Sequence, residues 1–154
     1  AWIDHSIYAL AELRGYLGEE PVSVSSTMAN LKYPRRVLDM EDYGLATYRY
    51  MSGVVANLEY DWIGGTSIPS TVVCERGRIR WGAEIPRDSV EVRTSRGIRL
   101  QKVPKGKDLS LLDHFVACLD LKRDTVQPAG LGALNLKAAL AAYRSAKLGR
   151  RVGV

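Results

Sequence analysis

Cysteine is scarce in this sequence: the chain has two, Cys74 and Cys118, which lie far apart and form no Cys-x-x-Cys motif. A disulfide framework or a zinc site needs more cysteines at closer spacing, so we predict neither, and no metal site. The sequence instead predicts two buried thiols, as is usual in the reducing cytosol. We therefore expect a cytoplasmic protein.

Long hydrophobic runs are also absent, because charged residues interrupt every apolar stretch. A membrane helix needs about 20 consecutive apolar residues, and no charged-then-apolar leader opens the chain. Neither membrane insertion nor export is predicted. Hydrophobic residues make up 46% of the chain and charged residues 25%, which is ordinary for a globular protein. The length of 154 residues suits a single domain, residues 1–154.

The net charge of +5 comes mainly from arginine, with basic clusters at residues 102–107 and at Arg150-Arg151. A nucleic-acid site needs such charges on one face, preferably with aromatic residues between them. Here they fall in an expected turn and near the end of the sequence, without aromatic neighbours. The pattern indicates a solvated surface, and a binder of nucleic acid or anionic ligands is the weakest of three functional hypotheses.

Helical patterns occupy the two ends of the chain. Apolar residues spaced three and four apart predict a first helix that ends at Gly18, with an apolar stripe of Ile3, Ile7, Leu10, Leu13 and Leu17. Similar stripes predict two further helices, one from Leu109 to Leu119 and one from Leu131 to Leu148, with Gly149 as its stop.

The middle of the chain carries strand patterns joined by short turns. Turn candidates at Ser52-Gly53, Arg76-Gly77 and 95–97 predict three hairpins, and tightly joined strands must be antiparallel. We predict an α+β domain with a predominantly antiparallel sheet of about six to eight strands and helices on one face. The other face must meet water, a ligand or another subunit. Tyr60 and Trp62 share one apolar parity, so we expect a homo-oligomer through this open face.

Several short motifs, taken in order, resemble one enzyme family. The run Asp4-His5-Ser6-Ile7-Tyr8, followed by Gly18-Glu19-Glu20-Pro21, resembles the first helix of the carboxyl-terminal domain in the glucose–fructose oxidoreductase (Gfo/Idh/MocA) family. That helix carries Asp-x-Gly-x-His or Asp-x-Gly-x-Tyr. Residues 41–62 resemble the family's strand pair, and residues 138–152 its last helix and tail. The resemblance spans nearly the whole chain.

Two details of the motif matter. Ser6 stands where the family usually has Gly. In a competing register His5 would take the family's His position, but Gly18-Glu19-Glu20-Pro21 would then be misplaced. The register with Asp4 and Tyr8 at the motif positions is therefore preferred.

The resemblance implies a GAPDH-like carboxyl-terminal domain of a two-domain enzyme that oxidises or reduces a sugar, polyol or dihydrodiol with NAD or NADP. Such enzymes hold the cofactor in an amino-terminal Rossmann domain with a Gly-rich loop and a Glu-Lys-Pro motif. Neither motif occurs here. We therefore expect a missing Rossmann partner, no cofactor bound by this chain, and no activity of the chain alone.

Asp4 and Tyr8 are four residues apart, so on a helix they lie on one face. They fall in the first turns, where the helix dipole favours an ionised carboxylate. By resemblance, Tyr8 is the acid/base or carbonyl hydrogen-bond donor and Asp4 orients it, with a lysine of the missing half as co-catalyst. His5 is an alternative site residue.

Spacing alone also allows Asp4 to be a helix cap and Tyr8 a core residue with its hydroxyl at the rim. A second functional hypothesis is therefore a non-catalytic dimerisation domain. Glu41 and Asp42 are predicted to be surface charges at the start of a strand.

Overall fold

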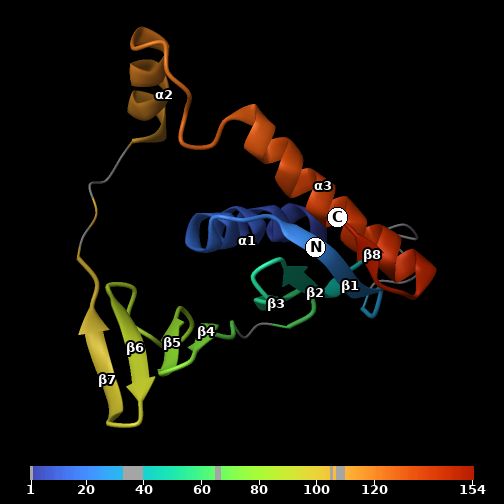
Figure 1. The fold of residues 1–154 in the computed structure, drawn as a ribbon, viewed down its shortest axis with the longest axis horizontal. Coiled ribbons are helices and arrows are strands. Elements are labelled where there is room, and N and C mark those ends of the chain that lie inside the picture. Colours follow the sequence, from blue (N-terminus) through green and yellow to red (C-terminus); the bar gives the residue numbers. More distant parts are fainter. Residues whose placement is uncertain (1, 33–39, 65–66, 105, 107–109) are drawn as a thin grey trace. The chain divides into compact units, whose positions relative to one another are not determined.

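The fold is taken from a computed structural model that describes residues 2–32, 40–64, 67–104, 106 and 110–154. Lys105 and Lys107 of the basic cluster, and Leu109 at the predicted start of the second helix, lie outside these residues. Figure 1 shows the order of the elements. They are α1 (Trp2–Leu17), β1 (Pro21–Ala29), β2 (Tyr43–Tyr50), β3 (Val55–Asp61), β4 (Ser70–Cys74), β5 (Gly77–Trp81), β6 (Ser89–Thr94), β7 (Gly97–Lys102), α2 (Leu111–Asp120), α3 (Ala129–Leu148) and β8 (Val152–Gly153). The α+β class is confirmed.

The strands form two four-stranded antiparallel sheets within the described residues, ordered β3-β2-β1-β8 and β4-β5-β6-β7. The chain divides into two compact units, one formed by Ala1–Gly64 with Cys118–Val154 and the other by Gly65–Ala117. Each predicted hairpin turn joins two paired strands: β2 to β3, β4 to β5, and β6 to β7.

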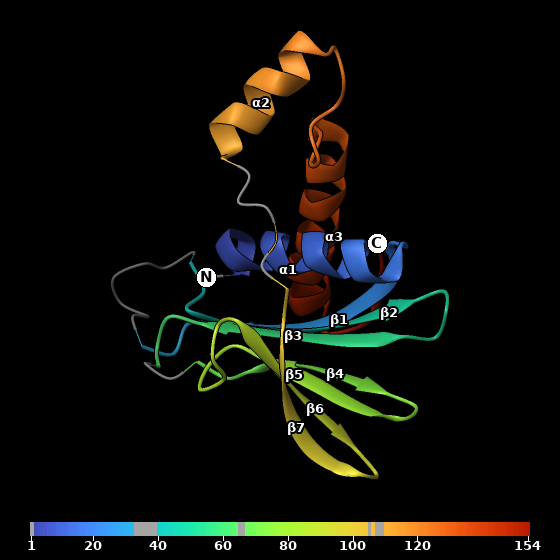
Figure 2. The ribbon, with the colours of Figure 1, turned by 90° about the vertical axis from the view of Figure 1, so that its left-hand side faces the viewer.

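In the first unit, α1 and α3 cover one face of the sheet (Figure 2). Alternate residues of β2 point toward these helices, so Ala46, Tyr48 and Tyr50 are buried. The α3 residues that pack here include Ala138, Ala139, Ala141 and Ala142, whose small side chains allow close approach. We had expected the two carboxyl-terminal helices on this face, but in the described residues α1 shares it with α3.

Four residues of the predicted α1 stripe, Ile7, Leu10, Leu13 and Leu17, pack against the core, and only the first turn differs from the prediction. The buried residues of α1 are Trp2, Ser6 and Leu10, spaced four apart, whereas Ile3 is 40% exposed. The Trp2 indole stacks on Tyr48 at 6.5 Å and donates a hydrogen bond from Nε1 to the carbonyl oxygen of Ala139 at 3.3 Å. Burying this ring, the largest on the helix, turns Ile3 partly toward solvent.

The open face of the first sheet is not the one that carries Tyr60. The Tyr60 ring lies edge-on to Trp2 at 6.1 Å, on the helix-covered side, so the predicted placement on the open face is wrong. The opposite parity of β3 is exposed and, apart from Val55, polar. There the Thr47 hydroxyl donates to Asn57 at 2.7 Å, and the Tyr43 hydroxyl donates to Glu59 at 2.9 Å.

The apolar stripe of α2 is exposed, at Leu111, Leu112, Phe115, Val116 and Leu119. On this helix only Cys118 is buried; Cys74, on β4, is exposed, so the prediction of two buried thiols is wrong for Cys74. The reason is that β4 is an edge strand whose residues are all exposed. Among the described residues, no helix is both long and apolar enough to cross a membrane.

Candidate functional site

Asp4 and Tyr8 lie on the exposed side of α1. Because Trp2, Ser6 and Leu10 face the core, residues 4 and 8, midway between them in the helical sequence, face away from it. The Asp4 side chain is 64% exposed and Tyr8 is 67% exposed. Neither side chain is therefore part of the core of the described residues.

Ser6, where the family has Gly, is fully buried on the opposite side of the helix, and its hydroxyl has no hydrogen-bond partner among the described residues. Ser6 therefore lies on the core side of α1, away from the exposed Asp4 and Tyr8.

His5 is the residue that Asp4 contacts. The Asp4 carboxylate lies 3.5 Å from His5 Nδ1, and no hydrogen bond between Asp4 and Tyr8 is found in the part of the chain that the structure describes. The His5 ring lies beside two aromatic rings of the β3 end, Tyr60 at 5.6 Å and Trp62 at 5.8 Å. Trp62 is itself 57% exposed. The structure thus brings an exposed carboxylate, an imidazole and an exposed indole together near the start of α1.

Glu41, which the sequence placed at the surface, is partly buried and links three elements. Its Oε1 accepts a hydrogen bond from the Trp2 backbone N–H at 2.7 Å and another from the Tyr143 hydroxyl at 2.8 Å. Burial alone would raise the pKa of Glu41, but several hydrogen bonds to its carboxylate, with that from the Tyr143 hydroxyl the largest, outweigh burial and lower the pKa from its ordinary value. Burial and the Glu41 carboxylate together raise the pKa of Tyr143.

Asp42 is buried, so its predicted surface position is also wrong. Its two carboxylate oxygens accept hydrogen bonds from the backbone N–H groups of Leu31 at 2.7 Å and Lys32 at 2.6 Å. Its carbonyl oxygen accepts one from the Trp62 N–H at 2.8 Å. The acidic pair therefore connects the β1 end, the β3 end and the start of α1, which the Glu41-Asp42 sequence alone does not reveal.

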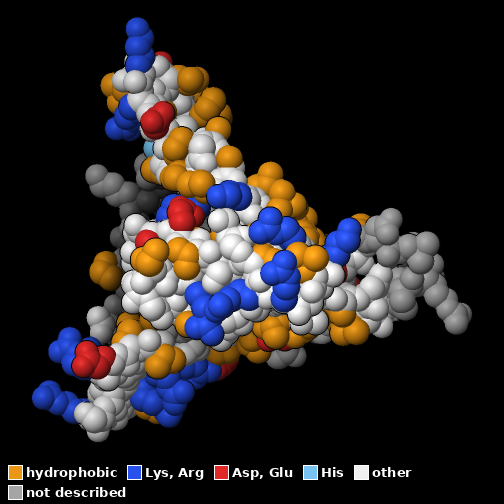
Figure 3. All heavy atoms as spheres, turned by 45° about the vertical axis from the view of Figure 1, so that its right-hand side comes forward, with side chains coloured by type: hydrophobic (Ala, Val, Ile, Leu, Met, Phe, Trp, Pro, Cys, Tyr) orange, Lys and Arg blue, Asp and Glu red, His pale blue; other side chains and the backbone are white. Residues whose placement is uncertain are grey.

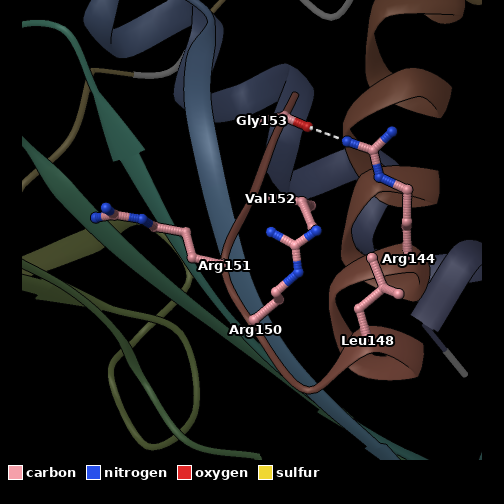
Figure 4. A pocket seen from close by; sticks show the side chains of 6 residues that line it. All are labelled: Arg144, Leu148, Arg150, Arg151, Val152 and Gly153. Carbon is pink, nitrogen blue, oxygen red and sulfur yellow. Dashed lines mark hydrogen bonds between the residues drawn. The ribbon is translucent and has the colours of Figure 1, made fainter.

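A separate groove lies between α3 and β8 and contains none of the predicted site residues. It encloses about 400 Å³ and is lined by Arg144, Leu148, Arg150, Arg151, Val152 and Gly153. Arg144 donates to the carbonyl oxygen of Gly153 at 3.0 Å. Figure 4 shows the guanidinium groups of Arg144 and Arg150 on one side of β8, with that of Arg151 directed away from them.

Figure 3 shows one face of the molecule, on which Lys and Arg side chains gather near the middle with few Asp or Glu side chains beside them. No carboxylate side chain lines the α3–β8 groove. Within the described ranges, no group of three or more His, Cys, Asp or Glu side chains could hold a metal ion.

Comparison with known proteins places the chain in a family. Residues 1–80 match the sequence profile described as "GFO/IDH/MocA C-terminal domain". The chain belongs to this family. No curated protein sequence matches it.

Solved structures share the fold over nearly the whole chain. Aldose-aldose oxidoreductase from Caulobacter crescentus, complexed with glycerol, aligns with a TM-score of 0.83 and 21% identity over 97% of this chain and 46% of its own. myo-Inositol 2-dehydrogenase from Lactobacillus plantarum aligns with a TM-score of 0.73 and 20% identity over 99% and 48%. A levoglucosan dehydrogenase bound to NADH and levoglucosan aligns with a TM-score of 0.76 and 16% identity, over 98% of this chain and 49% of its own. The chain therefore spans about half the length of these structures.

Proposed function

We propose that this chain is the substrate-binding half of an NAD(P)-dependent oxidoreductase that acts on a sugar, cyclic polyol or dihydrodiol. The observation that carries the proposal is the exposed Asp4 and Tyr8 pair on α1, in a chain of this family. The names of the structural neighbours, which include sugar and polyol dehydrogenases, support this substrate class. An amino-terminal Rossmann domain would supply the other half.

The residues of this chain do not fit a dinucleotide, because the sequence has no Gly-rich loop between a strand and a helix. The nicotinamide, bound by the other half, supplies the hydride acceptor or donor. The residues of this chain transfer the proton. In reduction, the Tyr8 hydroxyl donates its proton to the carbonyl oxygen and becomes a phenolate, and in oxidation that phenolate accepts the proton of the substrate hydroxyl, a role that typically contributes about 10²–10⁴-fold in rate.

Asp4 and His5 are the ionisable side chains that accompany Tyr8 in this proposal. The Asp4 carboxylate lies 3.5 Å from the imidazole, and Tyr60 and Trp62 limit the orientations of that ring. A lysine of the Rossmann half is proposed as co-catalyst. His5 is the alternative proton carrier, because it already contacts a carboxylate.

The test uses the longer protein that carries this chain. It is offered aldoses, cyclic polyols and dihydrodiols with NAD⁺ and with NADP⁺, and reduction of the cofactor is followed by absorbance. We expect turnover with at least one class, and none from the 154-residue chain by itself. Full activity of the chain without a Rossmann partner, or no turnover by the longer protein, would exclude the proposed function.

We further propose that the chain assembles through the open face of the β3-β2-β1-β8 sheet. On this face Leu45 and Val55 are exposed and Thr47 is partly exposed, while the described helices that pack on this sheet, α1 and α3, lie on its other face. Light scattering on the wild type and on Leu45→Lys tests this. A dimer that dissociates in the variant supports it, and a monomeric wild type excludes it. A dimer with no turnover would favour the non-catalytic dimerisation hypothesis.

A second candidate function is binding of an anionic ligand in the α3–β8 groove, favoured by Arg144 and Arg150 and the absence of a lining carboxylate. Titration of ¹⁵N-labelled chain with inorganic phosphate at low and high salt distinguishes it. Shifts confined to residues 144–153 that salt abolishes would support it. No shift at low salt would exclude it.

A further inference from the structure

We infer that Glu41 is a positioning residue of the candidate site: its carboxylate fixes the first turn of α1 and thereby the placement of Asp4 and Tyr8. The inference rests on the proposed function. Glu41 touches neither of these side chains in any hydrogen bond described above. It acts through the backbone of the helix that carries them.

The contact joins the first described turn of α1 to a distant part of the chain. Here the acceptor for Trp2 N–H is Glu41, 39 residues along the chain, at 2.7 Å. The beginning of α1 is therefore placed relative to the start of β2. Asp4 follows about 3 Å and Tyr8 about 9 Å along the helix axis.

Oε1 of Glu41 also accepts a hydrogen bond from α3. Tyr143, 102 residues from Glu41, donates its hydroxyl hydrogen to Oε1 at 2.8 Å. Both Glu41 and Tyr143 are partly buried, so water competes weakly for these bonds. A single carboxylate oxygen thus connects α1, α3 and the segment before β2. A displacement of Glu41 would release the helix start from both neighbours.

The other side of the site depends on the adjacent residue. The Asp42 carbonyl oxygen accepts from Trp62 N–H, and the Trp62 ring lies 5.8 Å from that of His5. Two consecutive residues therefore place both the first turn of α1 and the aromatic side chains beside it. Because a misplacement of about 1 Å at a reacting group costs about 10²-fold in rate, this junction should control turnover.

The experiment compares Glu41→Ala, Glu41→Gln and the control Tyr48→Phe in the longer protein. Gln keeps one carbonyl oxygen that can accept both hydrogen bonds. Tyr48→Phe removes another buried hydrogen bond to α3, from the Tyr48 hydroxyl to the Ala138 carbonyl oxygen at 3.0 Å, without touching the start of α1. The variants therefore separate positioning from a general loss of packing.

We expect Glu41→Ala to lower kcat by about 10–100-fold with a change in KM below about 3-fold, while Glu41→Gln and Tyr48→Phe stay within about 5-fold of the wild type. Hydrogen–deuterium exchange should accelerate at the amides of residues 2–8 in Glu41→Ala and not in Tyr48→Phe. If the wild type turns over and Glu41→Ala resembles Tyr48→Phe in kcat and exchange, the positioning role is wrong while the proposed function stands. If the wild type itself shows no turnover, both fail.

Discussion

At the scale of single residues, the fold depends on two carboxylates that the sequence placed at the surface. Glu41 and Asp42 follow a polar segment and begin a strand, a position where charged side chains are ordinarily solvated. Their burial is decided by N–H and O–H donors that come from residues 2, 31, 32 and 143. Such partners cannot be recognised from neighbouring residues in the sequence. That Asp4 and Tyr8 share one face of the helix, by contrast, follows directly from helical spacing.

Asp42→Ala should lower the free energy of unfolding by about 1–3 kcal/mol, because it removes a buried carboxylate that accepts hydrogen bonds from the backbone N–H groups of Leu31 and Lys32. Urea unfolding measures this loss. Asp61→Ala is the matched control, since Asp61 also accepts two backbone hydrogen bonds, from Ile63 and Gly64, but is exposed. Water replaces that acceptor, so its loss should be clearly smaller. Equal losses would contradict the role assigned to burial.

At the scale of the elements, turn chemistry predicted the hairpins correctly, and apolar periodicity predicted the helices. The burial of Trp2 in place of Ile3 was not predictable from periodicity, because two neighbouring apolar residues in the first described turn compete for the core. The burial of Trp2 needs a facing glycine: a Cβ on Gly44 would lie 2.8 Å from the Trp2 ring and 2.9 Å from Met28 Sδ. The absence of a side chain at Gly44 thus leaves room on β2 for the Trp2 ring of α1.

Gly44→Ala should therefore destabilise the protein by about 1–3 kcal/mol through overpacking between β2 and α1. Gly15→Ala is the control, because Gly15 lies on α1 with open space around its Cβ position. That substitution should stabilise the helix by about 0.5–1 kcal/mol. Thermal unfolding measures both. A stabilising Gly44→Ala would show that Trp2 does not pack against β2 as described.

At the scale of the whole molecule, the α+β class and the antiparallel pairing could be predicted, but the division of the strands into two sheets could not. Hairpin signals specify pairs such as β2 with β3 and β4 with β5, and they carry no information on whether β3 pairs with β4. The cytoplasmic location and the oligomeric state also stay predictions.

The buried tyrosines give the whole fold an alkaline limit. Burial raises the pKa of Tyr50 from 10.0 to about 12, and burial also raises the pKa of Tyr48. Since the folded pKa values exceed the unfolded ones, the stability from keeping these phenols neutral is complete below pH 10 and is lost as the pH rises toward 12. Phenolate absorbance should therefore rise together with loss of the circular-dichroism signal in this range. Ionisation of every tyrosine near pH 10 without unfolding would contradict it.

The central assignment is that Tyr8 moves the proton during hydride transfer. The most direct measurement is the single-turnover rate of hydride transfer in the longer protein, with wild type, Tyr8→Phe and Tyr16→Phe compared at one pH. Tyr16 is the matched control, since it lies on the same helix and is 62% exposed against 67% for Tyr8. We predict a loss of about 10²–10⁴-fold for Tyr8→Phe and no more than about 2-fold for Tyr16→Phe. A Tyr8→Phe rate equal to that of Tyr16→Phe would contradict the assignment.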